Sequence, residues 1–268
     1  MGFSLDIDSL PTLPVIAGQV MECLNNPNSS IQDVADVILR DQSMSVKVLK
    51  LVNSAYYGFP KRIGTLSHAI SILGFETVRG LVLGISILDT FRVKEFDLLR
   101  FWEHSIRTAS LMSFMAARLC YPRPDEAFTV GLIHDVGKLV FMLKAPDLYH
   151  QVVVQADINP CIQEQALLKM DHAFAGAQVA RSWNFPSTYV QAIESHHHRP
   201  GLPLDLPSLK EMIYLANAFD HHFNGHQLDE EDLQLFSKLD LTLESLDEYL
   251  ASKQQEVEDF LRILSPSP

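Results

Sequence analysis

The sequence predicts an all-α protein. Apolar residues recur at intervals of three and four along most of the chain, and no convincing alternation of the kind typical of β-strands is present. Apolar residues make up 47% of the 268 residues, which is enough to form a core. Glycine and proline separate the periodic segments, at the places where helices are expected to begin or end.

Residues 1–95 are expected to form a first block, a compact bundle of five helices. The first helix follows Pro14. The second begins after Ser30, a suitable N-cap because Asp33 stands three residues later, at the spacing of a capping box. The apolar stripe of this second helix consists of Ile31, Val34, Ala35 and Ile38.

Glycines are expected to end the later helices of this block. The third helix carries an apolar stripe over residues 44–55 and is expected to end at Gly58. The fourth is a short helix over residues 66–73 that Gly74 stops, and the fifth carries the apolar residues of the segment 78–85.

Residues 96–225 are expected to form a second block of longer helices. One helix should run from about residue 97 to residue 119 and end before Pro122, because proline breaks a helix interior. Asp125 is expected to cap the next helix, which stops before Pro146. Further helices are expected at about residues 161–169, 172–183, 186–197 and 206–222.

Residues 226–268 are expected to form an acidic, helical C-terminal extension. Such a helix either packs on the protein's own core or covers an apolar groove of a partner. The segment Tyr56-Tyr57-Gly58-Phe59-Pro60, in an expected loop, is a second candidate surface for a protein partner. The apolar residues of the extension recur at near-heptad spacing and are Leu246, Leu250, Val257, Phe260 and Leu264.

Composition argues against several classes of protein. The formal net charge is −12 and no Lys/Arg block occurs, so we expect no direct binding of nucleic acid. Residues 1–9 lack the features of a signal peptide, and the longest apolar windows, such as residues 78–88, are too short for a membrane span. We therefore expect a cytoplasmic protein that binds no membrane. Its cysteines fit a reducing compartment, since no C-x-x-C pair occurs among Cys23, Cys120 and Cys161.

The pair His134-Asp135 is the first candidate for chemistry. It is expected in the middle of a helix and among apolar residues, where a carboxylate is costly to bury unless it is paired or bound to a metal ion. Gly131 and Gly137 stand one turn to either side and would let another helix or a ligand come close. The alternative is that Asp135 faces solvent beside a hydrogen-bonded His134.

Further histidines are placed so that each expected helix of the second block offers one or two donor side chains. Bundle cores assemble metal sites from such donors on facing helices. Imidazole and carboxylate are also ordinary ligands of first-row transition metals. The additional candidates are His104, His172, His196, His197, His198, Asn217 and Asp220.

The order of these motifs resembles the HD superfamily of metal-dependent phosphohydrolases, and the whole run resembles its HDOD branch, a bacterial signalling-output domain. The resemblance covers roughly residues 10–225 and implies an N-terminal helical bundle packed on an HD-like helical part. The segments that carry it are Leu-Pro-Thr-Leu-Pro (10–14), Asn-Ser-Ala-Tyr-Tyr-Gly (53–58), Ala-Ile-Ser-Ile-Leu-Gly (69–74), Phe-Trp-Glu-His-Ser (101–105), Gly-Leu-Ile-His-Asp-Val-Gly-Lys-Leu (131–139), Asp-His-Ala-Phe-Ala-Gly-Ala (171–177), Trp-Asn-Phe-Pro (183–186) and Ala-Ile-Glu-Ser-His-His (192–197).

Carried over to this chain, the resemblance implies a site for one or two divalent transition-metal ions and no organic cofactor. Iron, manganese, zinc and nickel all suit a site rich in histidine and free of thiols. His198 is an extra residue in its run. The implied ligands are His104, His134 and Asp135 for one ion, and His172, His196 and His197 for a second.

Two departures from the family pattern bear on activity. The HD ligand set ends with an aspartate on a late helix, where this chain has Asn217, a weaker and uncharged donor. Asp220 lies three residues on and would replace that aspartate only after local rearrangement. The Gly-Tyr-Pro loop of the related cyclic di-nucleotide phosphodiesterases is absent, because Arg-Pro-Gly-Leu-Pro follows the histidines.

These observations leave two functions open. The resemblance implies a non-catalytic output or scaffold domain that binds protein partners, with a pocket that is a relic or a sensor of a small phosphorylated ligand. The near-complete ligand set favours a metal-dependent phosphohydrolase acting on a nucleotide or another phosphoester. In that case Lys138 would neutralise charge that develops on the substrate. The alternative for Lys138 is a helix-end side chain that extends to solvent.

Overall fold

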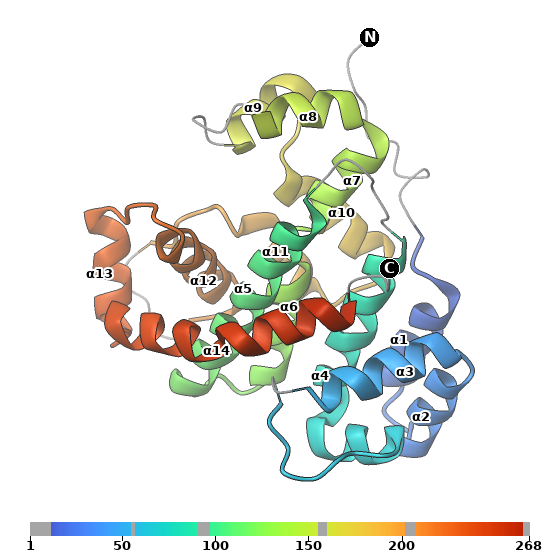
Figure 1. Cartoon of the computed structure of the whole chain (residues 1–268). Coiled ribbons are helices and arrows are strands. Elements are labelled where there is room, and N and C mark those ends of the chain that lie inside the picture. Colours follow the sequence, from blue (N-terminus) through green and yellow to red (C-terminus); the bar gives the residue numbers. More distant parts are fainter. Residues whose placement is uncertain (1–11, 55–56, 91–96, 155–159, 202–206, 265–268) are drawn as a thin grey trace.

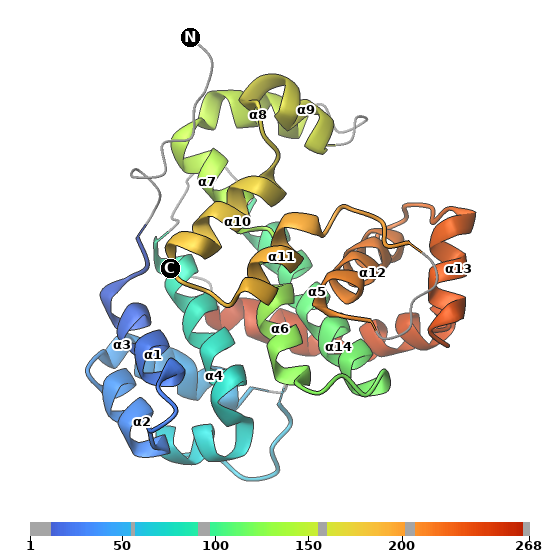
Figure 2. The same ribbon diagram turned by 180° about the vertical axis from the view of Figure 1, so that it is seen from behind.

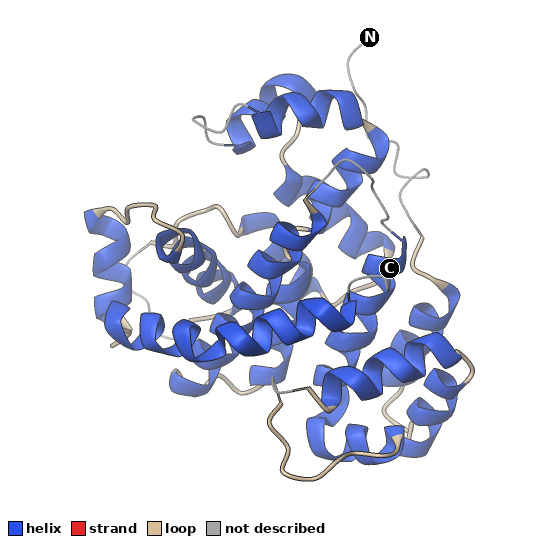
Figure 3. Ribbon diagram, viewed as in Figure 1, coloured by secondary structure: helices blue, strands red, loops and turns tan. Residues whose placement is uncertain are grey.

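The computed structural model of the chain describes residues 12–54, 57–90, 97–154, 160–201 and 207–264. Every regular element within these ranges is an α-helix (Figure 3), so the all-α prediction is confirmed. The N-terminal residues 1–9, Tyr56 of the aromatic segment and the expected helix start at Leu206 lie outside the described residues.

The first helices gather at one corner of the molecule, at the lower right of Figure 1. Ser30 starts the second of them with the expected capping box: its Oγ accepts from the backbone N–H of Asp33 at 3.2 Å, and the Asp33 carboxylate accepts from the backbone N–H of Ser30 at 2.8 Å. The helices of this corner are α1 (Val15–Asn25), α2 (Ile31–Leu39), α3 (Gln42–Val52) and α4 (Leu66–Thr90).

Gly74 interrupts α4 as the sequence predicts. Its φ of 79° is a left-handed conformation that glycine adopts without strain, and it separates the two helical stretches of α4. The end of α3 differs from the expectation, because the helix ends at Val52 and not at Gly58. Asn53 turns the chain there: its amide donates to the Ile63 carbonyl and accepts from the Ile63 backbone N–H.

Helix α4 contains an apolar stretch that is longer than the sequence windows suggest. The segment Leu66–Ile87 is long and apolar enough to cross a membrane by length and composition alone. However, 61% of its most apolar window is buried inside the protein, and the core helix of a soluble protein has the same composition. Burial of Val78, Leu81 and Val82 shows that this helix serves the protein's own core.

The second half of the chain begins with α5, which Asp97 caps as expected, by accepting from the Arg100 backbone N–H at 3.0 Å. The sequence predicts one long helix after α5. The structure has two helices there, because the helix is interrupted between α6 and α7. The helices of this half are α5 (Leu98–Arg118), α6 (Pro124–Ile133), α7 (Val136–Lys144), α8 (Pro146–Val154), α9 (Pro160–Leu168), α10 (His172–Ser182), α11 (Ser187–Ser195), α12 (Leu209–Phe223), α13 (Glu230–Lys238) and α14 (Leu243–Leu264).

Proline explains two of the differences from the expected boundaries. Pro124 occupies the first turn of α6, so Asp125 lies inside the helix and is not its cap. Pro146 does not only stop a helix, as expected, but also begins α8, because a proline at the first helical position loses no hydrogen bond there. The sequence expectations therefore do not include helix α8, whereas α13 lies within the C-terminal extension that was expected to be helical.

Packing places the second-half helices around α5 and α6. Helices α10 and α11 pack on α7 and α6 on the side seen in Figure 2, and α12 packs on α5. Helix α14 crosses the molecule and packs on both α5 and α3. Its apolar stripe is buried in the protein's own core, with exposures of 0–3% for Leu246, Leu250, Val257 and Phe260.

Candidate metal centre

The helix break at His134-Asp135 shapes the candidate site. His134 ends α6 and Asp135 precedes α7, so the expectation of a mid-helix pair is wrong. Asp135 has φ −92° and ψ 9°, and its side chain makes no capping bond to α7. The turn therefore leaves the carboxylate available to other side chains. Both residues are buried, with exposures of 0% for His134 and 1% for Asp135.

Two glycines bring the neighbouring helices close to this turn, as expected. A Cβ atom on Gly131 would lie 2.5 Å from the Cα of Ala109 in α5. A Cβ atom on Gly137 would lie only 2.0 Å from the carbonyl oxygen of His172 in α10. Glycine at these positions thus allows α5 and α10 to deliver their histidines to Asp135.

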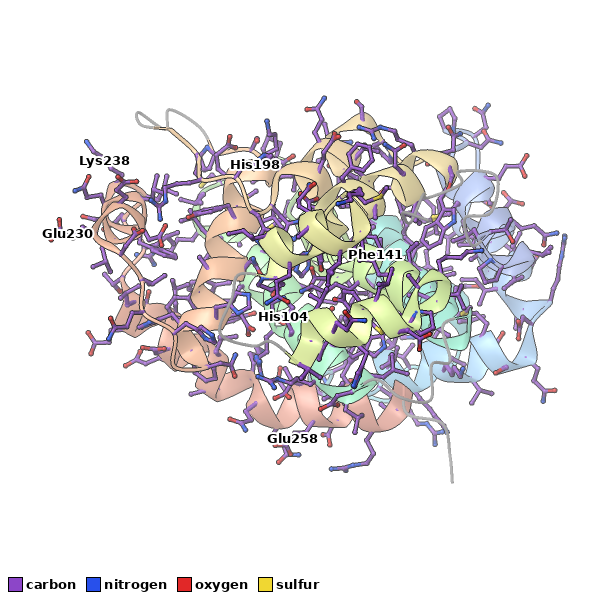
Figure 4. The ribbon with its side chains drawn as sticks, turned by 90° about the horizontal axis from the view of Figure 1, so that it is seen from above. His104, Phe141, His198, Glu230, Lys238 and Glu258 are labelled. Carbon is purple, nitrogen blue, oxygen red and sulfur yellow. The ribbon has the colours of Figure 1, made fainter. Side chains whose placement is uncertain are left out.

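A first group of three donor atoms consists of one oxygen of Asp135 and two imidazole nitrogens. His104 Nε2 from α5 lies 3.2 Å from His134 Nε2 and 3.4 Å from Asp135 Oδ2. His134 Nε2 lies 3.5 Å from the same oxygen. We call these three atoms the first triangle. His104 lies toward the middle of the helical body, whereas Glu230, Lys238 and Glu258 lie at its periphery (Figure 4).

A second group surrounds the other oxygen of Asp135. His172 Nε2 from α10 lies 3.2 Å from Asp135 Oδ1, and His196 Nε2 from the end of α11 lies 3.5 Å from it. The two imidazole nitrogens are 3.3 Å apart, and we call these three atoms the second triangle. His197 Nε2 lies 2.8 Å from His172 Nε2, which is shorter than the ~3.3 Å between two ligands of one ion, so the His197 ring must move away from His172 before it can add a fourth donor.

The remaining ring nitrogens fix which way each imidazole faces. His134 Nδ1 donates to the Gly131 carbonyl and His196 Nδ1 to the Ile193 carbonyl, each at 2.7 Å. His104 Nδ1 donates to Asp220, also at 2.7 Å. Because a carbonyl or carboxylate oxygen only accepts, Nδ1 carries the hydrogen and the Nε2 lone pair faces the triangle. Metal-bound histidines are oriented by outer contacts of this kind.

The donor atoms fit divalent metal ions. Ligands of one tetrahedral ion with bonds of roughly 2.0–2.1 Å lie about 3.3 Å apart, and the six edges of the two triangles measure 3.2–3.5 Å. Asp135 Oδ1 is buried without a hydrogen bond of good geometry. Two imidazole nitrogens at such distances share either a hydrogen or a metal ion.

Electrostatics keep most of the cluster in its metal-binding form. Burial alone would raise the pKa of Asp135, but His134 and Lys138 hold that pKa well below its usual range. Burial lowers the pKa of His134 and of His196. Burial would also lower the pKa of His104, yet the carboxylates of Asp220 and Asp135 raise it to about 9. Without metal, His104 therefore carries a proton that a metal ion must displace.

Lys138 contacts the site and does not extend freely to solvent. Its Nζ lies 2.5 Å from Asp135 Oδ2, the oxygen of the first triangle. The ammonium and a metal ion would share this oxygen. Lys138 thereby partly neutralises the carboxylate, and its side chain is 18% exposed at the edge of the site.

On α12, the side chain that holds His104 is Asp220. Its carboxylate accepts from His104 Nδ1 and, at 2.5 Å, from Arg107 Nε. Burial would raise the pKa of Asp220, but His104 and Arg107 lower it to about 2. Asn217, which the sequence resemblance predicts at the family's last ligand position, is buried one turn earlier on the same helix. His198, the extra histidine of its run, is exposed.

Sequence reasoning missed several residues around the site, among them His221, whose ring centroid lies 5.3 Å from that of His104. Arg107 lies one turn after His104, and its pairing with Asp220 spans 113 positions, which no local pattern reports. Glu164 on α9 is fully buried and accepts from His172 Nδ1 at 2.7 Å. It stands between two glutamines, Gln163 and Gln165, so the neighbouring sequence gives no sign that this carboxylate is buried.

Comparison with known proteins gives a consistent result. The HDOD domain family model matches residues 10–199. A candidate phosphohydrolase from Shewanella amazonensis SB2B is 28% identical, with a TM-score of 0.80 over 97% of this chain and 96% of that one. An HDOD domain protein with unknown function from Geobacter sulfurreducens has a TM-score of 0.76 at 23% identity, covering 97% and 95%.

Among curated proteins, an uncharacterized protein of Treponema pallidum (strain Nichols) is 26% identical over 227 residues, which is 82% of this chain. The chain spans only 44% of the length of that relative. The protein YuxH of Bacillus subtilis (strain 168) is 24% identical over 122 residues. The matched region covers 30% of the length of YuxH.

Proposed function

The chain belongs to the HDOD domain family, and we propose that it is a non-catalytic signal-transduction output domain that binds protein partners and holds a dinuclear metal centre. The single observation that carries the metal assignment is the pair of triangles that share Asp135. One divalent ion would be held by His104, His134 and Asp135. A second would be held by Asp135, His172 and His196, and His197 would add a further donor after its ring moves away from His172.

Burial supports a structural or regulatory role for this centre. His134, His172 and His196 are 0% exposed, so a bulky phosphoester has little access to the second triangle, whereas His104 at the first triangle has a side chain that is 13% exposed. Two sequence features also favour a non-catalytic role. They are the uncharged Asn217 at the family's last ligand position and the missing Gly-Tyr-Pro loop.

A separate cavity supports partner binding away from the metal centre. Its volume is about 970 Å³, and it lies between α3, residues 53–54 and 59–64, and the end of α14. Phe59 of the aromatic segment lines it and stacks on Tyr57, with ring centroids 6.1 Å apart. Lys50, Arg62 and Arg262 also line it, together with Asp259, which pairs with Arg262 at 3.3 Å, so the lining carries a net positive charge in a chain whose net charge is −12. An acidic protein segment would be attracted to such a surface.

The second candidate function is a metal-dependent phosphohydrolase, which the donor set of the two triangles favours. A bound divalent ion would lower the pKa of a coordinated water toward ~7 and so supply a nucleophile. Lys138 at the edge of the site could then hold a phosphoryl oxygen, although in this structure it pairs with Asp135.

Metal loading combined with an activity panel separates the two functions. Protein purified without added metal is expected to contain one to two transition-metal ions per chain, by elemental analysis, because both triangles are preformed. The same protein is expected to hydrolyse nucleotides and other phosphoesters no faster than its metal-stripped form.

The controls decide between the outcomes. Metal-dependent turnover that disappears in His134→Ala, with an unchanged thermal melt, would establish the hydrolase in place of the output domain. Protein that is metal-free as purified and also resists loading with zinc, manganese or iron would mean that the cluster is a hydrogen-bonded part of the core.

Two substitutions on α12 test how this helix supports the first triangle. Asp220→Asn removes the charge that orients His104 and is expected to weaken metal binding by about tenfold, as loss of an outer contact typically does. Asn217→Asp adds a charged oxygen one turn away and is expected to tighten binding. Titration with Zn²⁺ measures both effects, and an unchanged affinity in Asn217→Asp would place Asn217 outside the coordination sphere.

A further inference from the structure

Glu164 is a buried carboxylate that accepts two hydrogen bonds from one histidine of the second triangle. Its side chain is 0% exposed, and its Oε2 accepts from both the backbone N–H of His172 at 2.8 Å and the His172 Nδ1 at 2.7 Å. Its other oxygen, Oε1, is buried without a hydrogen bond. Burying a carboxylate in this way is costly unless a cation compensates for it. That cation is either the His172 ring itself, when it is protonated, or a metal ion at the second triangle on the far side of this ring.

The short distance shows that Glu164 orients His172 and does not coordinate a metal ion beside it. Cys161, Glu164 and His172 could in principle form a separate metal site, since their donor atoms lie within 4.8 Å of one another. However, two ligands of one tetrahedral ion lie about 3.3 Å apart, whereas 2.7 Å is the length of a charge-assisted hydrogen bond. The hydrogen on His172 Nδ1 leaves Nε2 free to face Asp135.

Glu164 also belongs to a part of the fold that stands apart from the rest. Helices α8 and α9 pair with each other and project from the helical body, at the top of Figure 1. Helix α8 packs on α7, where the rings of Phe141 and Tyr149 lie 5.7 Å apart. Glu164 supplies a polar connection from α9 to the start of α10.

We propose that Glu164 is a positioning residue, which holds His172 in place for the second metal position and couples occupancy of that position to the α8–α9 hairpin. This inference rests on the proposed dinuclear centre. A metal ion on His172 Nε2 would strengthen the bond from Nδ1 to Glu164, because coordination makes the ring a better donor. The hairpin would then be held more firmly in the loaded protein than in the metal-free protein.

The test compares Glu164→Gln with the wild type and with Glu258→Gln, which removes the same charge at the periphery (Figure 4). Gln keeps the size of the side chain and one acceptor oxygen, so the variant is expected to fold. Zn²⁺ titration is expected to show two binding steps in the wild type and in Glu258→Gln. In Glu164→Gln one step is expected to weaken by about 10- to 100-fold while the other is unchanged.

Two further readouts separate positioning from a merely structural role. Hydrogen exchange of the α8 and α9 amides is expected to slow when Zn²⁺ is added to the wild type, and to change little in Glu164→Gln. Nitrogen NMR of His172 is expected to show the hydrogen on Nδ1 in the zinc-loaded wild type. Glu164→Asp keeps the charge on a shorter side chain. Its Zn²⁺ affinity and its amide protection are expected to lie between those of the wild type and those of Glu164→Gln.

Failure of the role of Glu164 and failure of the metal centre give different results. Equal two-step binding and equal hairpin protection in the wild type and in Glu164→Gln would overturn the role of Glu164 and leave the dinuclear centre standing. A wild-type protein that binds no Zn²⁺ would overturn the dinuclear centre itself, and the inference with it.

Discussion

Asp135→Asn is expected to lose both metal ions, whereas His134→Ala and His196→Ala are each expected to lose one. Asp135 offers Oδ2 to the first triangle and Oδ1 to the second, so it is the donor common to both. Asparagine keeps the shape but removes the charge and replaces one donor oxygen by an NH₂ group. We expect Zn²⁺ affinity to fall by at least about 100-fold at both positions, since one ligand of each ion is weakened or lost.

Metal content of the purified variants and Zn²⁺ titration measure this effect. Lys138→Met is the matched control, because it removes the ammonium that pairs with Asp135 without removing a donor atom. We expect this control to retain both ions and to bind them somewhat more tightly, since a cation near the first triangle is gone. Loss of one ion only in Asp135→Asn would show that the carboxylate does not bridge the two positions.

Sequence alone predicts the helical periods and their local boundaries well. The capping box of Ser30, the interruption at Gly74 and the start of α5 at Asp97 all depend on neighbouring residues, so a local pattern is sufficient to find them. The close approach of helices at Gly131 and Gly137 is also predictable, because a glycine on either side of a polar pair leaves room for a neighbouring backbone.

The helix break at His134-Asp135 could not be predicted from periodicity. Phe128, Leu132, Val136 and Val140 continue at intervals of four across the break, and all four are buried. The apolar period is therefore kept while the backbone turns, and helix packing decides where it turns. The apolar period predicts which side chains are buried, but it does not predict where the helix is interrupted.

The convergence of the histidines could be proposed from the sequence. Asp220 is also among the sequence candidates, but as a metal donor, and its role in orienting His104 and the role of Glu164 could not be predicted. His104, His134 and His172 stand out because several histidines occur at intervals typical of separate helices. Asp220 and Glu164 act through contacts with His104 and His172 that depend on how α12 and α9 are placed. An acidic residue on a helix is common, and only its burial here distinguishes these two.

Gly137→Ala is expected to destabilise the protein by about 3 kcal/mol or more, because it places an atom where two backbones already touch. The added Cβ would lie 2.0 Å from the His172 carbonyl oxygen and 2.7 Å from the backbone nitrogen of Gly176. These are backbone atoms, so no side chain can rotate away to make room. Helix α10 must move away from α7, and His172 must move with it.

Urea denaturation of the metal-free protein measures the change in the free energy of unfolding. Gly18→Ala is the matched control: Gly18 lies within α1 with nothing within 4 Å of its added Cβ, so we expect it to stabilise by roughly 0.5–1 kcal/mol. If the Gly137→Ala variant folds, we expect its Zn²⁺ binding to weaken more at the second triangle than at the first, since His104 and His134 do not lie on α10. Wild-type stability in Gly137→Ala would mean that α7 and α10 are not in backbone contact, and the second triangle would lose its structural basis.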